Sequence, residues 1–75
     1  MELLERITID PRIMNGVPCI RNMRMPVATI LSMLAEGFDE KYILKEFEDL
    51  EPEDIKASLK FASETLRTRE YPLAV

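Results

Sequence analysis

The sequence contains no histidine, no tryptophan and one cysteine, Cys19. The absence of histidine removes the residue that most often performs general acid-base catalysis. A lone cysteine without histidine provides neither a disulfide framework nor a zinc site, and the sequence has no glycine-rich phosphate loop. The carboxylates cluster in one acidic stretch instead of forming an isolated pair in an apolar setting. The sequence therefore predicts a protein that is not an enzyme and that binds no cofactor or metal.

Long hydrophobic runs are also absent. No apolar run approaches the roughly 18 residues that a membrane-spanning helix requires, and residues 1–5 are acidic, unlike the basic start of a signal peptide. We therefore expect a cytoplasmic protein without membrane contact. Cys19 is expected to be a small buried apolar side chain, because nothing near it in the sequence would activate its thiol.

The chain is short for a self-sufficient domain. A domain of 75 residues buries only about 60% of the surface that its unfolded chain exposes. Domains below roughly 70 to 80 residues are usually stabilised further by disulfides, metals or oligomerisation. Since the first two are excluded, the sequence predicts self-association, most simply as a homodimer.

The charges are segregated along the chain, although the net charge is −4. Residues 11–35 contain arginines but no acidic residue, and residues 36–54 contain nine carboxylates against two lysines. From Ile55 onward the basic residues outnumber the acidic ones. The sequence therefore predicts a basic arm, an acidic middle and a mildly basic last helix.

The first third of the chain has the pattern of strands and turns. Residues 6–9 alternate polar and apolar side chains, which is typical of a short half-buried strand. Cys19-Ile20 is expected to pair with Met23-Arg24 across a two-residue turn at Arg21-Asn22, because asparagine tolerates the left-handed conformation. Residues 6–26 are therefore predicted to form a β-hairpin arm.

Three helices are predicted after the arm. A helical period begins at Val27, and Gly37 is expected to end this helix. Asp39 is a good N-cap for a second, short helix, and Pro52 opens a third helix that runs to about Arg67. The apolar stripes of the three helices contain, in order, Val27, Ile30, Leu31 and Leu34; Ile43, Leu44 and Phe47; and Ile55, Leu59, Ala62 and Leu66.

These elements predict one mostly α domain over residues 1–75. Its fold class is a short N-terminal β-hairpin arm followed by a three-helix, homeodomain-like (helix-turn-helix-like) bundle over residues 27–68, with a tail at 69–75. In such folds the last helix enters the major groove of DNA and its cations neutralise phosphates.

Opposite its apolar stripe, the third helix carries a basic face. Its cations, Lys56, Lys60 and Arg67, are candidate contacts to nucleic acid or to a protein partner. The first turn of the same helix, however, carries carboxylates that would repel phosphates, namely Glu51, Glu53 and Asp54. DNA contact through the basic face is therefore one alternative, and a merely solvated face is the other.

The arm supplies the other three candidate residues. Arg12, Arg21 and Arg24 lie in a loop-rich stretch without a compensating carboxylate. They could contact a nucleic-acid backbone or an acidic patch on a partner, including the 36–54 segment of a second copy. In the structural alternative, Arg21 and Arg24 donate hydrogen bonds to backbone carbonyls and hold a tight hairpin.

The motifs of the chain resemble those of a small prokaryotic family, DUF433. The resemblance rests on residues 6–11, on residues 15–27 (Asn-Gly-Val-Pro-Cys-Ile-Arg-Asn-Met-Arg-Met-Pro-Val), on Gly37 and on the helix start Pro-Glu-Asp-Ile at 52–55. It covers roughly residues 6–67. The chain departs from the family pattern at Asn15, Val17, Asn22, Met23 and Glu51. Asparagine in place of glycine keeps the turns feasible, and Glu51 in place of threonine weakens the cap of the third helix.

The resemblance implies a function as well as a fold. Members of this family look like homeodomain-like, three-helix proteins that are often dimeric, and many of them are described as antitoxins encoded beside a PIN-like ribonuclease toxin. The resemblance therefore implies a homodimeric, antitoxin-like module that binds such a toxin, with its own operator DNA as a further candidate ligand. Arg21 and Arg24 match the arginines of the family pattern. The alternative is a helix-turn-helix transcriptional regulator without a toxin partner.

Overall fold

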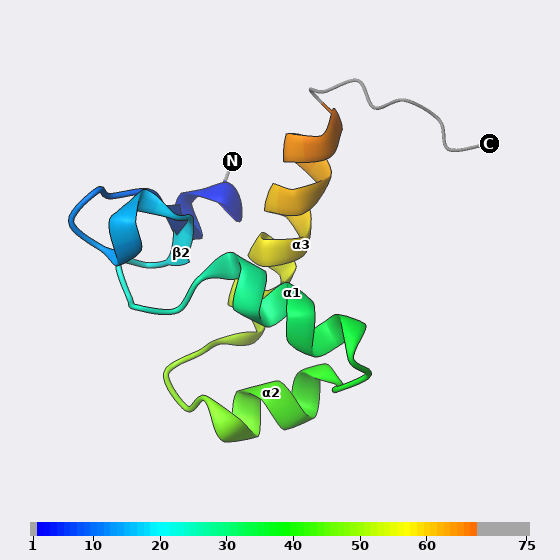
Figure 1. The fold of residues 1–75 in the computed structure, drawn as a ribbon. Helices are drawn as coiled ribbons and strands as arrows, with labels where there is room; N and C mark the ends of the chain where they lie inside the picture. The colour runs from blue at the N-terminus through cyan, green and yellow to red at the C-terminus, as the bar shows by residue number, and fades with distance from the viewer. Residues whose placement is uncertain (1, 68–75) are drawn as a thin grey trace.

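The structure is a computed structural model of the chain, and it describes residues 2–67. The predicted tail at 69–75 lies outside the described residues. Within residues 2–67 the chain is mostly helical, with a two-stranded antiparallel sheet near its N-terminus (Figure 1). This confirms the mostly α class. The elements are η1 (Leu4–Arg6), β1 (Ile7–Thr8), η2 (Met14–Gly16), β2 (Cys19–Ile20), α1 (Val27–Ala35), α2 (Glu40–Glu46) and α3 (Pro52–Arg67).

The sheet of the arm forms between β1 and β2. The two strands pair antiparallel, with Ile7 opposite Ile20. The predicted pairing of β2 with Met23-Arg24 is wrong, because the partner on the second edge of Cys19 is Pro26. β2 is therefore the central segment of the arm, held by β1 on one edge and by the chain entering α1 on the other.

The predicted two-residue turn is present, but the chain does not return directly into a strand. Arg21 and Asn22 have φ angles of 42° and 61°, and the Met23 N–H donates to the Ile20 carbonyl at 2.7 Å. A further bend at Met23 and Arg24 follows. Because of this bend, the carbonyl that meets the Ile20 N–H is that of Met25, at 3.0 Å.

Local signals set the ends of α1 and the start of α2 as predicted. Gly37 follows α1 with a φ of 100°. The N–H of Phe38 donates to the Met33 carbonyl at 3.1 Å, and the Gly37 N–H donates to the Leu34 carbonyl at 3.1 Å, which is the Schellman pattern of a helix end. Asp39 caps α2, since its Oδ1 accepts a hydrogen bond of 2.8 Å from a backbone N–H of the first turn.

The inward face of α3 differs from the predicted stripe. Leu59 and Leu66 are 51% and 57% exposed, so the stripe through them does not face the core. The buried residues of the helix are Asp54, Ile55, Ala57 and Ser58. The arm pairs with Asp54, and this carboxylate lies on the buried face of the helix. The buried Ser58 hydroxyl donates to the Asp54 backbone carbonyl at 2.9 Å, so this hydroxyl has a hydrogen-bond partner.

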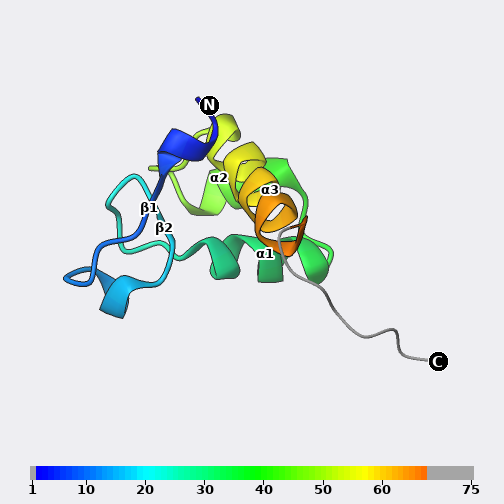
Figure 2. The ribbon, with the colours of Figure 1, turned by 90° about the horizontal axis from the view of Figure 1, so that it is seen from above.

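One apolar core joins the arm and the three helices. Its buried side chains are Ile20, Val27, Ile30, Ile43, Leu50 and Ile55. Cys19 is 1% exposed, which confirms its predicted burial. The arm lies to one side of the helices (Figure 2), and the second half of α3 extends beyond α1 and α2 (Figure 1). None of the helices within residues 2–67 has the length and apolar character that crossing a membrane would need.

Candidate partner-binding site

A buried carboxylate at the start of α3 fastens the arm to the helices. The Asp54 side chain has no exposed surface. Its Oδ1 accepts hydrogen bonds from Arg21 Nε at 3.1 Å and from Arg6 Nη1 at 2.9 Å. Its Oδ2 accepts from Arg21 Nη2 at 2.8 Å and from the Glu51 N–H at 2.8 Å. Two arginines and one backbone donor therefore satisfy this buried charge.

These contacts keep Asp54 ionised. Burial raises the pKa of its carboxyl, but the hydrogen bonds from Arg21, from the Glu51 N–H and from Arg6 outweigh burial, so the pKa lies below its ordinary value. The bond to Glu51 N–H also performs the second half of a capping box, in which the third helical residue binds the N-cap N–H. This hydrogen bond compensates for the weaker helix cap that was expected from glutamate at position 51.

Arg21, the candidate residue of the turn, is engaged within the chain. Besides its two bonds to Asp54, its Nη2 donates to the Asp49 carbonyl at 2.7 Å. This geometry resembles the structural alternative from the sequence, although the main acceptor is a carboxylate on α3. Sequence reasoning missed Arg6 and treated Asp54 as a surface charge. The position of Asp54 in the first turn of a helix that lacks a good N-cap residue was the available signal.

The other two arginines of the arm point into solvent. Arg12 forms a two-pronged ion pair with Asp10, with Nη2 at 2.9 Å from Oδ2 and Nε at 3.1 Å from Oδ1, and its side chain is 89% exposed. Arg24 is also exposed, and its Nη1 lies 3.7 Å from the Met14 sulfur. Arg24 is thus the arginine of the arm that has no carboxylate partner among residues 2–67.

The cations of α3 are partly neutralised by one glutamate. Lys60 Nζ lies 3.2 Å from Glu64 Oε2, and Arg67 Nε lies 3.9 Å from the same oxygen. Lys56 is exposed, and no carboxylate in the described part of the chain pairs with it. The predicted basic face therefore exists, but only Lys56 has its charge unpaired there.

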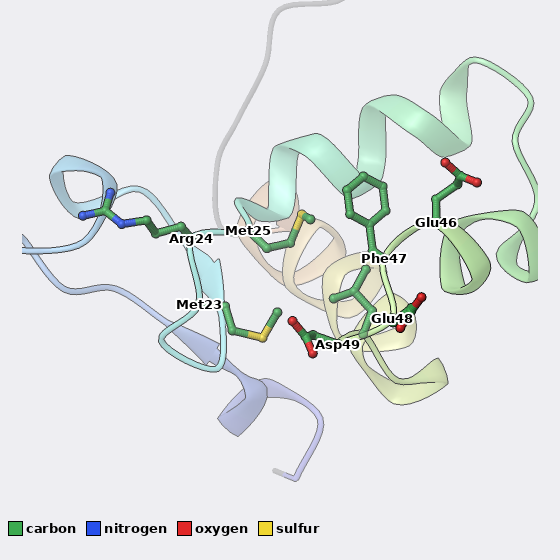
Figure 3. A pocket seen from close by; sticks show the side chains of 8 residues that line it. Met23, Arg24, Met25, Glu46, Phe47, Glu48 and Asp49 are labelled. Carbon is green, nitrogen blue, oxygen red and sulfur yellow. The ribbon is translucent and has the colours of Figure 1, made fainter.

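A groove of about 580 Å³ opens between the loop that precedes α1 and the connection from α2 to α3. We call it the methionine groove. Met23, Met25, Phe47 and Leu50 form its apolar part, and Glu46, Glu48, Asp49 and Arg24 complete its lining. Figure 3 shows the Arg24 side chain extending away from the other lining residues. Among residues 2–67, no cation pairs with the three carboxylates, so this wall of the groove is acidic.

A second, apolar groove of about 330 Å³ lies where the arm, the start of α1 and the second half of α3 meet. Val17 and Leu66, which are 42% and 57% exposed, line this groove.

Within residues 2–67, no three histidine, cysteine, aspartate or glutamate side chains are placed to hold a metal ion together.

The family can now be assigned. The sequence model of the family described as "Protein of unknown function (DUF433)" matches residues 7–62. The chain belongs to the DUF433 family. The matched region extends from β1 into α3, so it includes Arg21, Asp54 and the whole methionine groove.

A solved structure of a DUF433 member supports this assignment. The chain is similar to a DUF433 member protein from Anabaena variabilis, known from a crystal structure, at 29% sequence identity and a TM-score of 0.78. The similarity covers 88% of this chain and 65% of the other, so this chain spans under two thirds of that protein. No curated protein matches the chain.

Proposed function

We propose that this DUF433 protein is a non-enzymatic, antitoxin-like binding module whose partner is a PIN-like ribonuclease toxin. The observation that carries the proposal is the state of Arg24. It is one of the two arginines matched to the family pattern, it is exposed, and no carboxylate of residues 2–67 pairs with it. The other matched arginine, Arg21, anchors the loop that carries Arg24.

The loop around Arg24 is held in place before any partner binds. Arg21 ties it to Asp54 and to the Asp49 carbonyl, and the Ile20 N–H ties it to Met25. A preorganised loop loses little conformational entropy on binding. A guanidinium presented in this way suits a cluster of aspartates, such as that of a PIN-like ribonuclease, because arginine and carboxylate pair through two parallel hydrogen bonds.

The proposal includes a homodimer. A 75-residue chain with one small core gains stability when apolar surface is covered by a second copy. Leu59 and Leu66, seven residues apart on α3, supply exposed apolar surface for this contact.

Operator binding by a homeodomain-like α3 receives less support. Lys56 is available to a phosphate, but Glu64 lies between Lys60 and Arg67 and would oppose a backbone contact. The exposed Glu53 in the first turn of α3 opposes it as well. A regulator that binds DNA without a toxin is the alternative function, and the test below separates the two.

The test uses the purified protein and a small PIN-like protein with clustered aspartates encoded in the adjacent reading frame. Light scattering should show a dimer that shifts to a larger complex when the second protein is added. Arg24→Ala should weaken the complex about tenfold or more. Arg12→Ala is the matched control, because Arg12 is an exposed arginine of the same arm that is already paired, and it should retain the affinity. An unchanged mass, together with a gel shift of the upstream DNA, would favour the regulator.

A further inference from the structure

The methionine groove combines an apolar wall with an unpaired acidic wall. Met23, Met25 and Phe47 are partly buried and pack against the core, so their exposed edges form a supported apolar surface. Methionine side chains are flexible and polarisable and adapt to the shape of an incoming group. Surfaces of this kind accept long aliphatic or aromatic side chains.

The acidic wall is formed by Glu46, Glu48 and Asp49. All three side chains are exposed, and Arg24, the cation of the groove lining, extends away from them (Figure 3). Three carboxylates within four consecutive residues, with an apolar wall beside them, produce a local negative potential. Such a surface attracts cations and repels phosphates.

The backbone beneath the acidic wall is fixed. The Asp49 carbonyl accepts the 2.7 Å hydrogen bond from Arg21, and the Leu50 N–H donates to the Phe47 carbonyl at 3.0 Å. Leu50 itself is buried in the core. The carboxylates are therefore presented from a preorganised connection, which lowers the entropic cost of binding.

We propose that the methionine groove receives a lysine or arginine side chain from a segment of a protein partner. The aliphatic stem of that side chain lies on Met23, Met25 and Phe47, and its charged head lies among the carboxylates of the acidic wall. Long basic side chains bury their stems and keep their heads in polar surroundings in this manner. The inference rests on the proposed function in one respect, namely that the partner is a protein.

The experiment separates the groove from general charge attraction. The probe is an acetylated 12-residue peptide of lysine and leucine at helical spacing, and the readout is the shift of backbone amide resonances of the full chain on titration. Shifts should concentrate at residues 23–25 and 46–50. A second peptide with glutamine in place of lysine should bind at least tenfold more weakly. Equal binding of the two peptides would overturn the proposal.

Two triple variants with equal charge changes complete the test. The groove variant Glu46→Gln/Glu48→Gln/Asp49→Asn should weaken lysine-peptide binding about tenfold. The control variant Glu36→Gln/Glu40→Gln/Glu53→Gln removes three exposed carboxylates outside the groove and should change it less than about twofold. Equal weakening by both variants would refute the groove as the binding site.

The same variants distinguish this inference from the proposed function. If the lysine peptide binds the groove variant and the control variant equally well while the PIN-like protein binds the unmodified chain, the groove inference fails and the antitoxin-like function stands. If the PIN-like protein does not bind at all while the lysine peptide maps to the groove, the proposed toxin fails and the groove remains a site for a basic protein segment.

Discussion

Arg21 and Asp54 form a two-pronged ion pair across 33 positions of the chain, with Nε at 3.1 Å from Oδ1 and Nη2 at 2.8 Å from Oδ2. The pair joins the turn of the arm to the first turn of α3. Arg6 joins the same carboxylate from the start of β1. This buried charge thus ties the arm to α3, and with it the loop that carries Arg24 and lines one side of the methionine groove.

Asp54→Asn should lower the free energy of unfolding by about 2 kcal/mol, since hydrogen bonds to charged groups contribute about 1.5 to 3 kcal/mol. The amide keeps the shape of the side chain, but its NH₂ group cannot accept the bonds that the second carboxylate oxygen accepts. Urea denaturation followed by circular dichroism measures the change. Glu53→Gln is the matched control, because it makes the same chemical change at an exposed neighbour, and it should shift stability by less than about 0.5 kcal/mol.

A double-mutant cycle tests whether Arg21 and Asp54 act as a unit. Because the two side chains share hydrogen bonds, the combined loss in Arg21→Ala/Asp54→Asn should be smaller than the sum of the two single losses. The free energies of unfolding of the four proteins give the coupling directly. Additive losses would show that the two side chains contribute to stability independently of each other.

Stability should decrease in acid because of the same carboxylate. The pKa of Asp54 is lowered in the folded state, whereas an unfolded aspartate has its ordinary value of about 3.9. A depressed folded pKa adds stability above the unfolded value, and this contribution is lost as the pH falls from about 4 through the folded pKa. Urea midpoints measured between about pH 5 and pH 2.5 should fall steeply for the unmodified chain.

Asp54→Asn should make that pH profile shallower. Some slope will remain, because the hydrogen bonds from the Arg12 side chain and backbone also lower the pKa of Asp10. Profiles of equal slope in the two proteins would show that Asp54 does not titrate differently in the folded and unfolded chains.

The helix boundaries could be predicted because their signals are local. Gly37 at a positive φ, Asp39 as an N-cap and Pro52 in a first turn act through neighbouring residues. The partner of β2 and the inward face of α3 depend instead on contacts between distant segments. The ion pair of Arg6 with Glu51, for example, spans 45 positions, and no periodicity along the chain encodes it.

The candidate site was predictable to a similar degree. Charge patterning identified the six cations, but it did not show which of them pair within the chain. That outcome depends on which carboxylate the fold brings near, as with Arg12 and Asp10 or Lys60 and Glu64. The methionine groove was not predictable, because its walls come from two segments that become neighbours only through the core.

The turn at Arg21 and Asn22 gives a prediction about backbone strain. Asn22 has a φ of 61°, a conformation that β-branched residues strongly disfavour. Asn22→Val should therefore lower the free energy of unfolding by about 1 to 2 kcal/mol, and Asn22→Gly should change it by less than about 0.5 kcal/mol. Both variants keep the backbone N–H that donates to Thr8 Oγ1 at 2.9 Å. Urea denaturation of the two variants therefore isolates the effect of the positive φ on stability.

The difference between the buried and the exposed face of α3 gives a prediction that also tests self-association. Ile55 is 2% exposed and Leu59 is 51% exposed, so Ile55→Ala should cost about 3 kcal/mol through the cavity it leaves. Within one chain, Leu59→Ala should cost less than about 0.5 kcal/mol. If a second copy covers Leu59, however, its truncation will weaken the dimer, and the loss of stability relative to the unmodified chain will be larger at high protein concentration, where the unmodified chain is dimeric, than at low concentration. Urea midpoints at two protein concentrations distinguish these cases, because a monomer shows the same midpoint at both and a dimer held through Leu59 does not.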